Sequence, residues 1–229
     1  MLSMQQTWIE LEEHPDIQPA TAIVGSPGLR SIGKLVTDEL IHEYDAKLIG
    51  HLFSTHFPIQ YQTKPAYASQ PHLPGIGGVH ISDGHPALPS VKFYLSASPP
   101  LLVIDGYHPN FDGQYEVGDK VLEFCQQLAV KRIIVVAGYG LKGDAVCIAA
   151  TSKTLLSELH DQFGLDIGYE GPFYGFSGMI FGLAKTRGLD AITLFGQTTP
   201  DSQAPERPDE SAAQSVLEVL WSMLARAKN

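Results

Sequence analysis

Three short and almost uninterrupted apolar segments limit the folds open to this chain: residues 101–105 (LLVID), 132–137 (RIIVVA) and 189–195 (LDAITLF). A strand that is apolar on both sides must be covered on both faces, as strands in parallel sheets are. A fourth apolar run, residues 20–24, ends in a Gly-Ser-Pro-Gly turn. We therefore predict that these four segments are the central strands of one parallel-dominated sheet.

Segments with apolar residues at helical spacing separate these strands. The expected helices cover residues 31–43, 116–128, 152–163, about 171–187 and about 209–227. Strands that alternate with helices are typical of a sheet with helices on both faces. The sequence thus predicts an α/β fold, a three-layer αβα sandwich with a mostly parallel central sheet. We expect one domain over residues 1–229, because a chain of this length can form a single core.

Further strands are expected where polar and apolar residues alternate or short apolar runs recur. These are residues 7–12, 47–57 and 146–151. The turn-forming DGHP sequence at residues 83–86 also predicts a hairpin, in which residues 79–82 pair with residues 91–95.

The net charge of the chain argues against negatively charged partners. The formal net charge is −10, which disfavours nucleic acids and anionic membranes. The first residues lack the basic and apolar regions of a signal peptide, and no apolar stretch is long enough to span a bilayer. We expect a cytoplasmic protein whose two cysteines, Cys125 and Cys147, are reduced and lie in the core.

Ligands of open parallel sheets bind outside the carboxyl ends of the strands. The candidate ligand-binding residues at these ends and at the start of the fourth helix are Gly25, Ser26, Gly28, Asp105, Tyr107, His108, Gly138, Tyr139, Gly171 and Ser177. The Gly25–Gly28 turn could hold an anion with backbone N–H groups, or its glycines could serve the turn alone. It matches neither the GxxxxGK[ST] nor the GxGxxG phosphate motif, so we expect no cofactor.

Asp105 and His108 could form an orienting carboxylate and a general base, or they could be ordinary loop residues. Ser177 lacks the spacing of a G-x-S-x-G elbow, which favours capping or packing. The short HISDGH segment, residues 80–85, contains two histidines and an aspartate without a further ligand in sight. We therefore assign no catalytic residue and no metal site.

Four blocks of sequence together resemble one family: residues 25–41 (GSPGLRSIGKLVTDELI), 132–140 (RIIVVAGYG), 171–198 (GPFYGFSGMIFGLAKTRGLDAITLFGQT) and 208–220 (PDESAAQSVLEVL). The chain is similar to the proteasome assembly chaperone family, in its archaeal and bacterial PAC-two branch. The resemblance implies a phosphorylase/hydrolase-like core, homo-oligomers and, in some relatives, binding to proteasome α subunits. Some relatives are classed as ATP-grasp ligases, but the flap, lysine and acidic ligands of those enzymes are not found here.

Two functions remain open at this point. The first is a non-enzymatic chaperone or adaptor that contacts proteasome subunits, with the loop at 58–90 (Tyr61, Tyr67) and the segment 221–224 as contact elements. Family members that bind through a C-terminal tail end in a hydrophobic residue, tyrosine and any residue. The sequence ends Arg226-Ala227-Lys228-Asn229, so we expect contact through the folded domain. The second function is a small-molecule-binding protein or hydrolase-like enzyme with its pocket at the strand ends.

Overall fold

The computed structural model describes residues 6–57, 79–141, 143, 145–199, 201 and 207–226. Its strands are β1 Thr7–Leu11, β2 Thr21–Gly25, β3 Lys47–Ser54, β4 His80–Ser82, β5 His85–Ala87, β6 Val91–Ala97, β7 Pro100–Asp105, β8 Arg132–Tyr139, β9 Val146–Ala150, β10 Asp166–Ile167 and β11 Asp190–Gln197. Its helices are α1 Ile32–Glu43, α2 Gln114–Gln127, α3 Lys153–Phe163, α4 Gly175–Thr186 and α5 Glu210–Arg226, with short 3₁₀ turns η1 Leu29–Ser31 and η2 Phe111–Gly113. The predicted contact residues Tyr61 and Tyr67, the 75–78 turn and the tail at 227–229 lie outside the described residues.

The central sheet follows the order β1-β3-β6-β7-β2-β8-β11-β9-β10. Its middle, β7-β2-β8-β11, is parallel throughout, and these are the four strands predicted from the apolar segments. The prediction of a parallel centre is therefore confirmed. Antiparallel pairing extends the sheet on one side through β6, β3 and β1, and joins β9 to β11 on the other.

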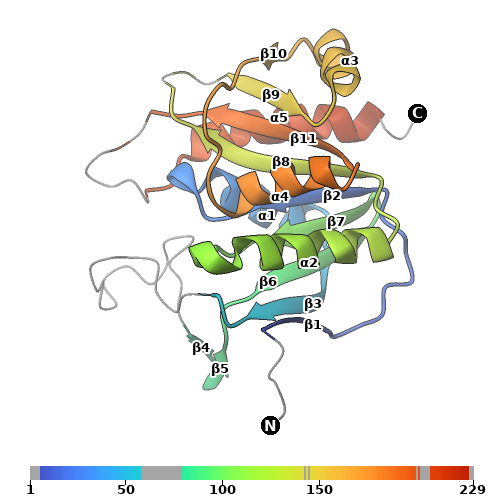
Figure 1. Cartoon of the computed structure of the whole chain (residues 1–229), viewed down its shortest axis with the longest axis vertical. Helices are drawn as coiled ribbons and strands as arrows, with labels where there is room; N and C mark the ends of the chain where they lie inside the picture. The colour runs from blue at the N-terminus through green and yellow to red at the C-terminus, as the bar shows by residue number, and fades with distance from the viewer. Residues whose placement is uncertain are drawn as a thin grey trace.

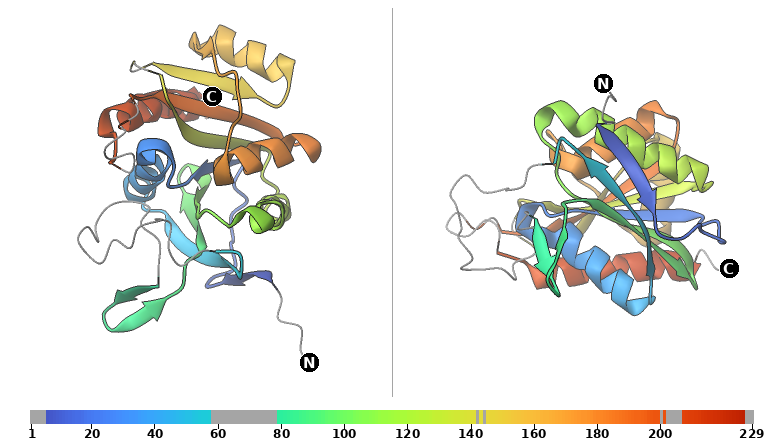
Figure 2. Two further views of the ribbon diagram at one scale, coloured as in Figure 1. Left: turned by 60° about the vertical axis from the view of Figure 1, so that its left-hand side comes forward. Right: turned by 90° about the horizontal axis from the view of Figure 1, so that it is seen from below.

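Helices cover the two faces of the sheet, as the three-layer prediction requires. Figure 1 shows α2 and α4 in front of the sheet with α1 and α5 behind it, and the right-hand view of Figure 2 shows the layers edge-on. Alternate residues of one strand serve the two cores: Leu101 and Val103 pack toward α1 and α5, whereas Leu102 and Ile104 pack toward α2 and α4. This period of two explains why the central strands are apolar on both sides.

Helices α3 and α5 pack on the same core, and specific residues cap their ends. The Ser152 side chain accepts a hydrogen bond from the Leu155 N–H at the start of α3, and Gly164 ends that helix with a left-handed φ of 65°. At α5, the Asp209 carboxylate accepts from the Ala212 N–H at 3.1 Å. Trp221, in the predicted contact segment 221–224, packs partly buried against the core of this face.

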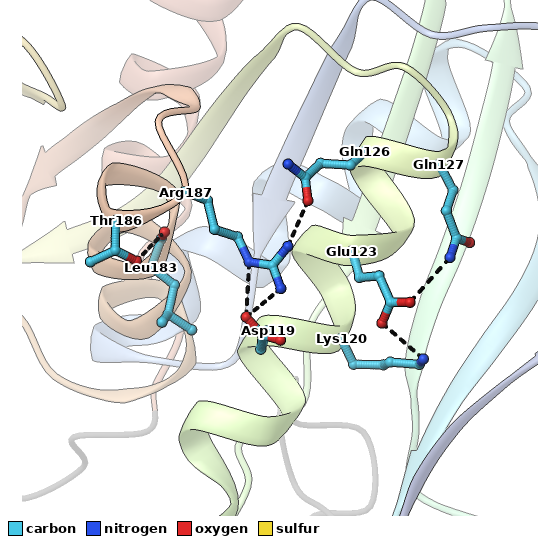
Figure 3. Close-up of polar contacts among 8 residues, drawn as sticks. All are labelled: Asp119, Lys120, Glu123, Gln126, Gln127, Leu183, Thr186 and Arg187. Atoms are coloured by element: carbon cyan, nitrogen blue, oxygen red, sulfur yellow. Dashed lines mark hydrogen bonds and ion pairs between the residues drawn. The ribbon is translucent and has the colours of Figure 1, made fainter.

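Two neighbouring helices on the other face, α2 and α4, run in the same direction. The Arg187 side chain, just after α4, binds the Asp119 carboxylate at 2.8 Å through Nε and Gln126 at 2.6 Å through Nη1 (Figure 3). Gly118 of α2 faces Met179 and Leu183 of α4, where an added Cβ would lie 3.0 Å from Leu183. Close packing and this surface link bring the first turns of both helices to the same edge of the sheet.

The predicted hairpin has a different partner strand. His80–Ser82 pairs with His85–Ala87, around a turn in which Asp83 and Gly84 both have positive φ. Val91–Ala97, expected to be its partner, pairs instead with β3 and β7 in the central sheet. Left-handed Asp-Gly is the turn that joins strands most tightly, so the short hairpin closes before residue 91 is reached. Its two histidines and Asp83 are exposed.

Cys125 and Cys147 are both buried and free, as expected. Within the described residues, every helix is too short or too polar to cross a membrane.

Candidate functional site

The turn between β2 and α1 sits in the middle of the carboxyl edge of the sheet. Its two flanking glycines allow helix and strand to touch: a Cβ on Gly25 would lie 2.1 Å from the Gly33 carbonyl oxygen, and one on Gly33 would lie 2.8 Å from the Val136 carbonyl oxygen. Both contacts are with backbone, which cannot move aside. The glycines therefore serve chain packing, and Gly25 contributes its carbonyl oxygen to the Gly106 N–H at 2.7 Å.

Two consecutive residues in the same turn, Arg30 and Ser31, have left-handed φ values of 52° and 53°. Such a conformation costs about 1 kcal/mol or more for a residue with a side chain. It is held from both sides: the Ser31 N–H donates to the Gly28 carbonyl oxygen at 3.0 Å, and the Arg30 carbonyl oxygen accepts from the Asp209 N–H at 3.0 Å. The start of α1 is thereby fixed to the start of α5.

His108 lies between this turn and α4, and both of its ring nitrogens have backbone partners. Nε2 donates to the Pro27 carbonyl oxygen, and Nδ1 accepts from the Phe176 N–H at 3.2 Å. This arrangement requires the neutral ring with the proton on Nε2. Burial lowers the pKa of His108, against the opposing effect of the Pro27 carbonyl. His108 thus links the turn to α4 through two backbone hydrogen bonds.

One cavity, of about 440 Å³, opens between the first turns of α1 and α4. Five Tyr and Phe rings line it, and we call it the aromatic cavity. Tyr169 stacks on Phe195 with ring centroids 4.8 Å apart, while Tyr139 and Phe173 meet these rings edge-on at 5.0 Å. Its lining also includes Ser26, Gly28, His108, Gly138 and Ser177. Such a cavity suits a flat apolar group.

Two serine hydroxyls supply the buried polar groups of the aromatic cavity. The Ser26 and Ser177 Oγ atoms lie 3.1 Å apart, and the residues are 3% and 5% exposed. One hydroxyl donates to the other, which leaves one O–H donor in the pair for another acceptor. Ser177 is the third residue of α4, and its hydroxyl is paired with that of Ser26.

A second cavity, of about 520 Å³, lies on the other side of the same turn. We call it the charged cavity, because Lys34, Lys92 and Asp105 line it. Phe53 of β3 and residues 86–89, in β5 and directly after it, form further walls. The left-hand view of Figure 2 shows this hairpin projecting from the body of the protein.

Asp105 ends β7 on the face covered by α1. Its side chain is only 12% exposed, and Oδ2 lies 3.3 Å from the Lys34 ammonium. Lys34 also pairs with Asp38 one turn later in α1. Burial raises the pKa of Asp105, although Lys34 opposes this. Burial alone would lower the pKa of Lys34, but the two carboxylates outweigh it and raise that pKa.

The structure divides the predicted ligand-binding residues between two places. Ser26, Gly28, His108, Gly138, Tyr139 and Ser177 line the aromatic cavity, whereas Asp105 and Tyr107 line the charged cavity. Gly25 lies beneath the turn, and Gly171, with φ of 138°, lies outside both linings. The residues from 25 to 28 separate the two cavities instead of joining them, because Pro27 faces the charged one.

Sequence reasoning did not identify several lining residues. Tyr169 and Phe195 come from separate segments, and only the fold brings their rings together. Lys34 and Lys92 were likewise not singled out. The alternation of β6 is a usable signal for Lys92, since Val91 and Phe93 point into one core and place Lys92 on the opposite face.

Large apolar side chains are exposed at the edge where α2 and α4 begin. Phe111, Tyr115 and Tyr174 are 89%, 69% and 79% exposed. Phe111 is in η2 and Tyr115 in the first turn of α2, while Tyr174 precedes α4 directly. We call these three residues the edge patch.

Residues 22–226 match the model of the PAC2 family. The chain belongs to the PAC2 family. The resemblance read from the four sequence blocks is therefore confirmed, and the match covers the strands and helices that form both cavities.

Relatives and solved structures agree with this assignment. The chain is 26% identical over 213 residues to an uncharacterised protein of Methanocaldococcus jannaschii, covering 89% of this chain and 74% of that protein. The structure is similar to that of Pyrococcus furiosus PbaB, an archaeal proteasome activator, with 26% identity, a TM-score of 0.78 and coverage of 97% and 90% of the two chains. It shares the fold of P. furiosus PbaA, an archaeal homologue of proteasome-assembly chaperone, with 24% identity, a TM-score of 0.73 and coverage of 96% and 86%.

Proposed function

We propose that this protein is a non-enzymatic proteasome assembly chaperone or adaptor that acts as a homo-oligomer and binds proteasome α subunits through the edge patch. Membership of the PAC2 family and the similarity to a proteasome activator support the choice of partner. The observation that carries the proposal is the edge patch itself.

Three aromatic side chains at one edge are costly to leave in water. Phe111, at 89% exposure, would bury most of its ring on contact with a partner. Aromatic residues are enriched at protein interfaces, where they are frequent anchors of binding free energy. Burial of such a side chain stabilises a complex by about 2 kcal/mol. The edge patch has the composition of an interface core.

The patch is held on rigid elements. The Arg187 bonds to Asp119 and Gln126 fix α2 against α4 (Figure 3), and the His108 bonds fix the start of α4 to the turn after β2. A preorganised surface loses less conformational entropy when it binds. A stable complex would need roughly 800 Å² buried on each partner, which requires neighbouring surface as well as the three rings.

The test is capture of α-subunit rings from the host's own proteasome by the purified full-length protein. The double variant Phe111→Ser, Tyr174→Ser should lose most of the captured ring. The matched control is Ile167→Ser, which removes a large apolar side chain of 56% exposure at the far edge of the sheet. Equal capture by wild type and double variant would refute the edge patch, and no capture by wild type would refute the proteasome role.

Self-association is a separate part of the proposal. Light scattering after size-exclusion chromatography should give a mass that is a multiple of 24.9 kDa. A monomer at concentrations that support ring capture would contradict it.

A small-molecule function is the second candidate, because six predicted residues, Tyr139 among them, meet four further Tyr and Phe rings at the aromatic cavity. Ala137 also lines this cavity, and Ala137→Phe would fill it without substituting any edge-patch residue, although Tyr174 borders both. Ring capture that survives Ala137→Phe favours the chaperone. Loss of a cellular ligand that co-purifies with wild type, with capture unchanged, favours the small-molecule role.

A further inference from the structure

Asp105 is a buried carboxylate with unused capacity for hydrogen bonds. An ionised carboxylate has about four acceptor positions, and the residue is 9% exposed. Lys34 contacts Oδ2, while Oδ1 has no partner among the described residues. An unsatisfied buried acceptor is costly in a native fold and calls for an explanation.

Lys92 is the complementary group in the same cavity. It stands opposite Asp105 in the register of β6 and β7, so the two side chains project side by side from one face of the sheet. Within the described part of the chain, Lys92 makes no ion pair, with Asp105 or with any other acidic residue. A half-buried ammonium and a buried carboxylate thus lie next to each other with bonding capacity unused.

The charges around the cavity balance. Lys34 and Lys92 contribute two positive charges, and Asp105 together with Asp38, which pairs with Lys34, contributes two negative ones. A simple anion would be repelled by Asp105, and a simple cation by the two lysines. A ligand that carries both charges close together fits this pattern better than either.

The remaining walls combine apolar residues with the polar side chains of His51, His80 and Ser90. The Phe53 ring, half-buried and stacked on His51 at 5.5 Å, lies on one side, and Leu88 lies on the hairpin side. The volume of about 520 Å³ lies within the range of small-molecule sites. An apolar side chain attached to the charged groups would be covered here.

We propose that the charged cavity binds an α-amino acid with an apolar side chain, its ammonium group held by Asp105 and its carboxylate by Lys92. This site is separate from the edge patch, so the proposal does not depend on the proteasome role.

The probe is L-phenylalanine, titrated into the full-length protein by calorimetry and followed by amide NMR. Binding should shift the amide resonances of Lys92 and Gly106 and leave that of Gly138, in the aromatic cavity, in place. Two analogues separate the charges: 3-phenylpropionate lacks the ammonium group and 2-phenylethylamine lacks the carboxylate. Each should bind at least about tenfold more weakly than L-phenylalanine, because each leaves one protein charge unpaired.

The variants Asp105→Asn and Lys92→Met should each weaken binding of L-phenylalanine by about tenfold or more. Lys120→Met, in the exposed Lys120–Glu123 pair of α2, is the control and should bind like wild type. The comparison of L-phenylalanine with its two analogues uses the wild-type protein, so it tests the proposal even if a variant does not fold. Absence of binding at about 10 mM, equal affinity for an analogue, or shifts confined to the aromatic cavity would overturn the proposal.

Discussion

The Nδ1 atom of His108 accepts a hydrogen bond from the Phe176 N–H at 3.2 Å. One side chain thereby satisfies a backbone donor at the start of α4, where no acidic side chain is present in the first turn. Because Nε2 of the same ring bonds the Pro27 carbonyl, the histidine connects the two segments that border the aromatic cavity. The edge patch and this cavity therefore depend on an uncharged His108.

We expect protonation of His108 to destabilise the fold. Burial lowers its pKa below the usual 6.5, so the unfolded chain binds the proton more readily. The stabilisation is present above about pH 6.5 and is lost as the pH falls through the lower folded-state pKa. Denaturant unfolding at pH 7 and pH 5 should show a smaller loss of unfolding free energy in His108→Gln than in wild type.

His42→Gln, at an exposed position in α1, is the control for that measurement and should behave like wild type. A pH dependence of His108→Gln as steep as that of wild type would mean that other groups cause the loss.

The Lys34–Asp105 pair should respond unequally to removal of its two members. Lys34→Met leaves Asp105 buried without its cation, and we expect a loss of about 2 kcal/mol at pH 7, below the range for fully buried pairs. Asp105→Asn should cost less, since burial already raises the pKa of this carboxyl and the amide carries no charge. The double variant should be more stable than Lys34→Met alone, as a double-mutant cycle by chemical denaturation would measure.

The raised pKa of Asp105 also determines how its contribution to the free energy of unfolding changes with pH. The folded state retains the Asp105 proton to a higher pH than the unfolded chain, so this group opposes folding once the pH rises above about 4. Asp105→Asn should remove that part of the pH dependence. If the losses of unfolding free energy in the two single variants simply add, the two side chains are not coupled. That result, or a double variant less stable than Lys34→Met, would contradict the prediction.

Gly25 and Gly182 should give opposite results when changed to alanine. At Gly25 the new Cβ meets the Gly33 carbonyl oxygen at 2.1 Å, so α1 must move from the sheet and we expect a loss of about 3 kcal/mol or failure to fold. At Gly182, in the exposed part of α4, a Cβ meets no atom within 4 Å, and alanine should gain about 0.5–1 kcal/mol. Thermal unfolding of both variants measures the difference; a tolerated Gly25→Ala would contradict the close approach.

Local sequence was sufficient for the central sheet and insufficient for the site. The apolar segments at 101–105 and 132–137 are covered on both faces wherever their partners lie, so their pattern alone predicts β7 and β8. The partner of residues 79–82 depended on turn geometry at Asp83 and Gly84, and the predicted pairing with 91–95 was wrong.

The division into two cavities has a similar cause. The positions of the strand ends predicted which residues lie at the carboxyl edge of the sheet. They did not predict which cavity each of these residues faces. Ser26 and Pro27, adjacent in the turn, face different cavities, and Arg30 and Ser31, which follow them, have left-handed φ values. Nothing in residue type favours that backbone conformation at an arginine followed by a serine.

Hydrogen–deuterium exchange of the protein, alone and with α-subunit rings of its host's proteasome, tests the central claim most directly. Peptides covering residues 110–116 and 172–178, which contain Phe111, Tyr115 and Tyr174, should exchange more slowly in the complex. The β10 edge around Ile167 should exchange at the same rate in both states. Slower exchange elsewhere, with the 110–116 and 172–178 peptides unchanged, would contradict the edge patch as the surface that binds the proteasome.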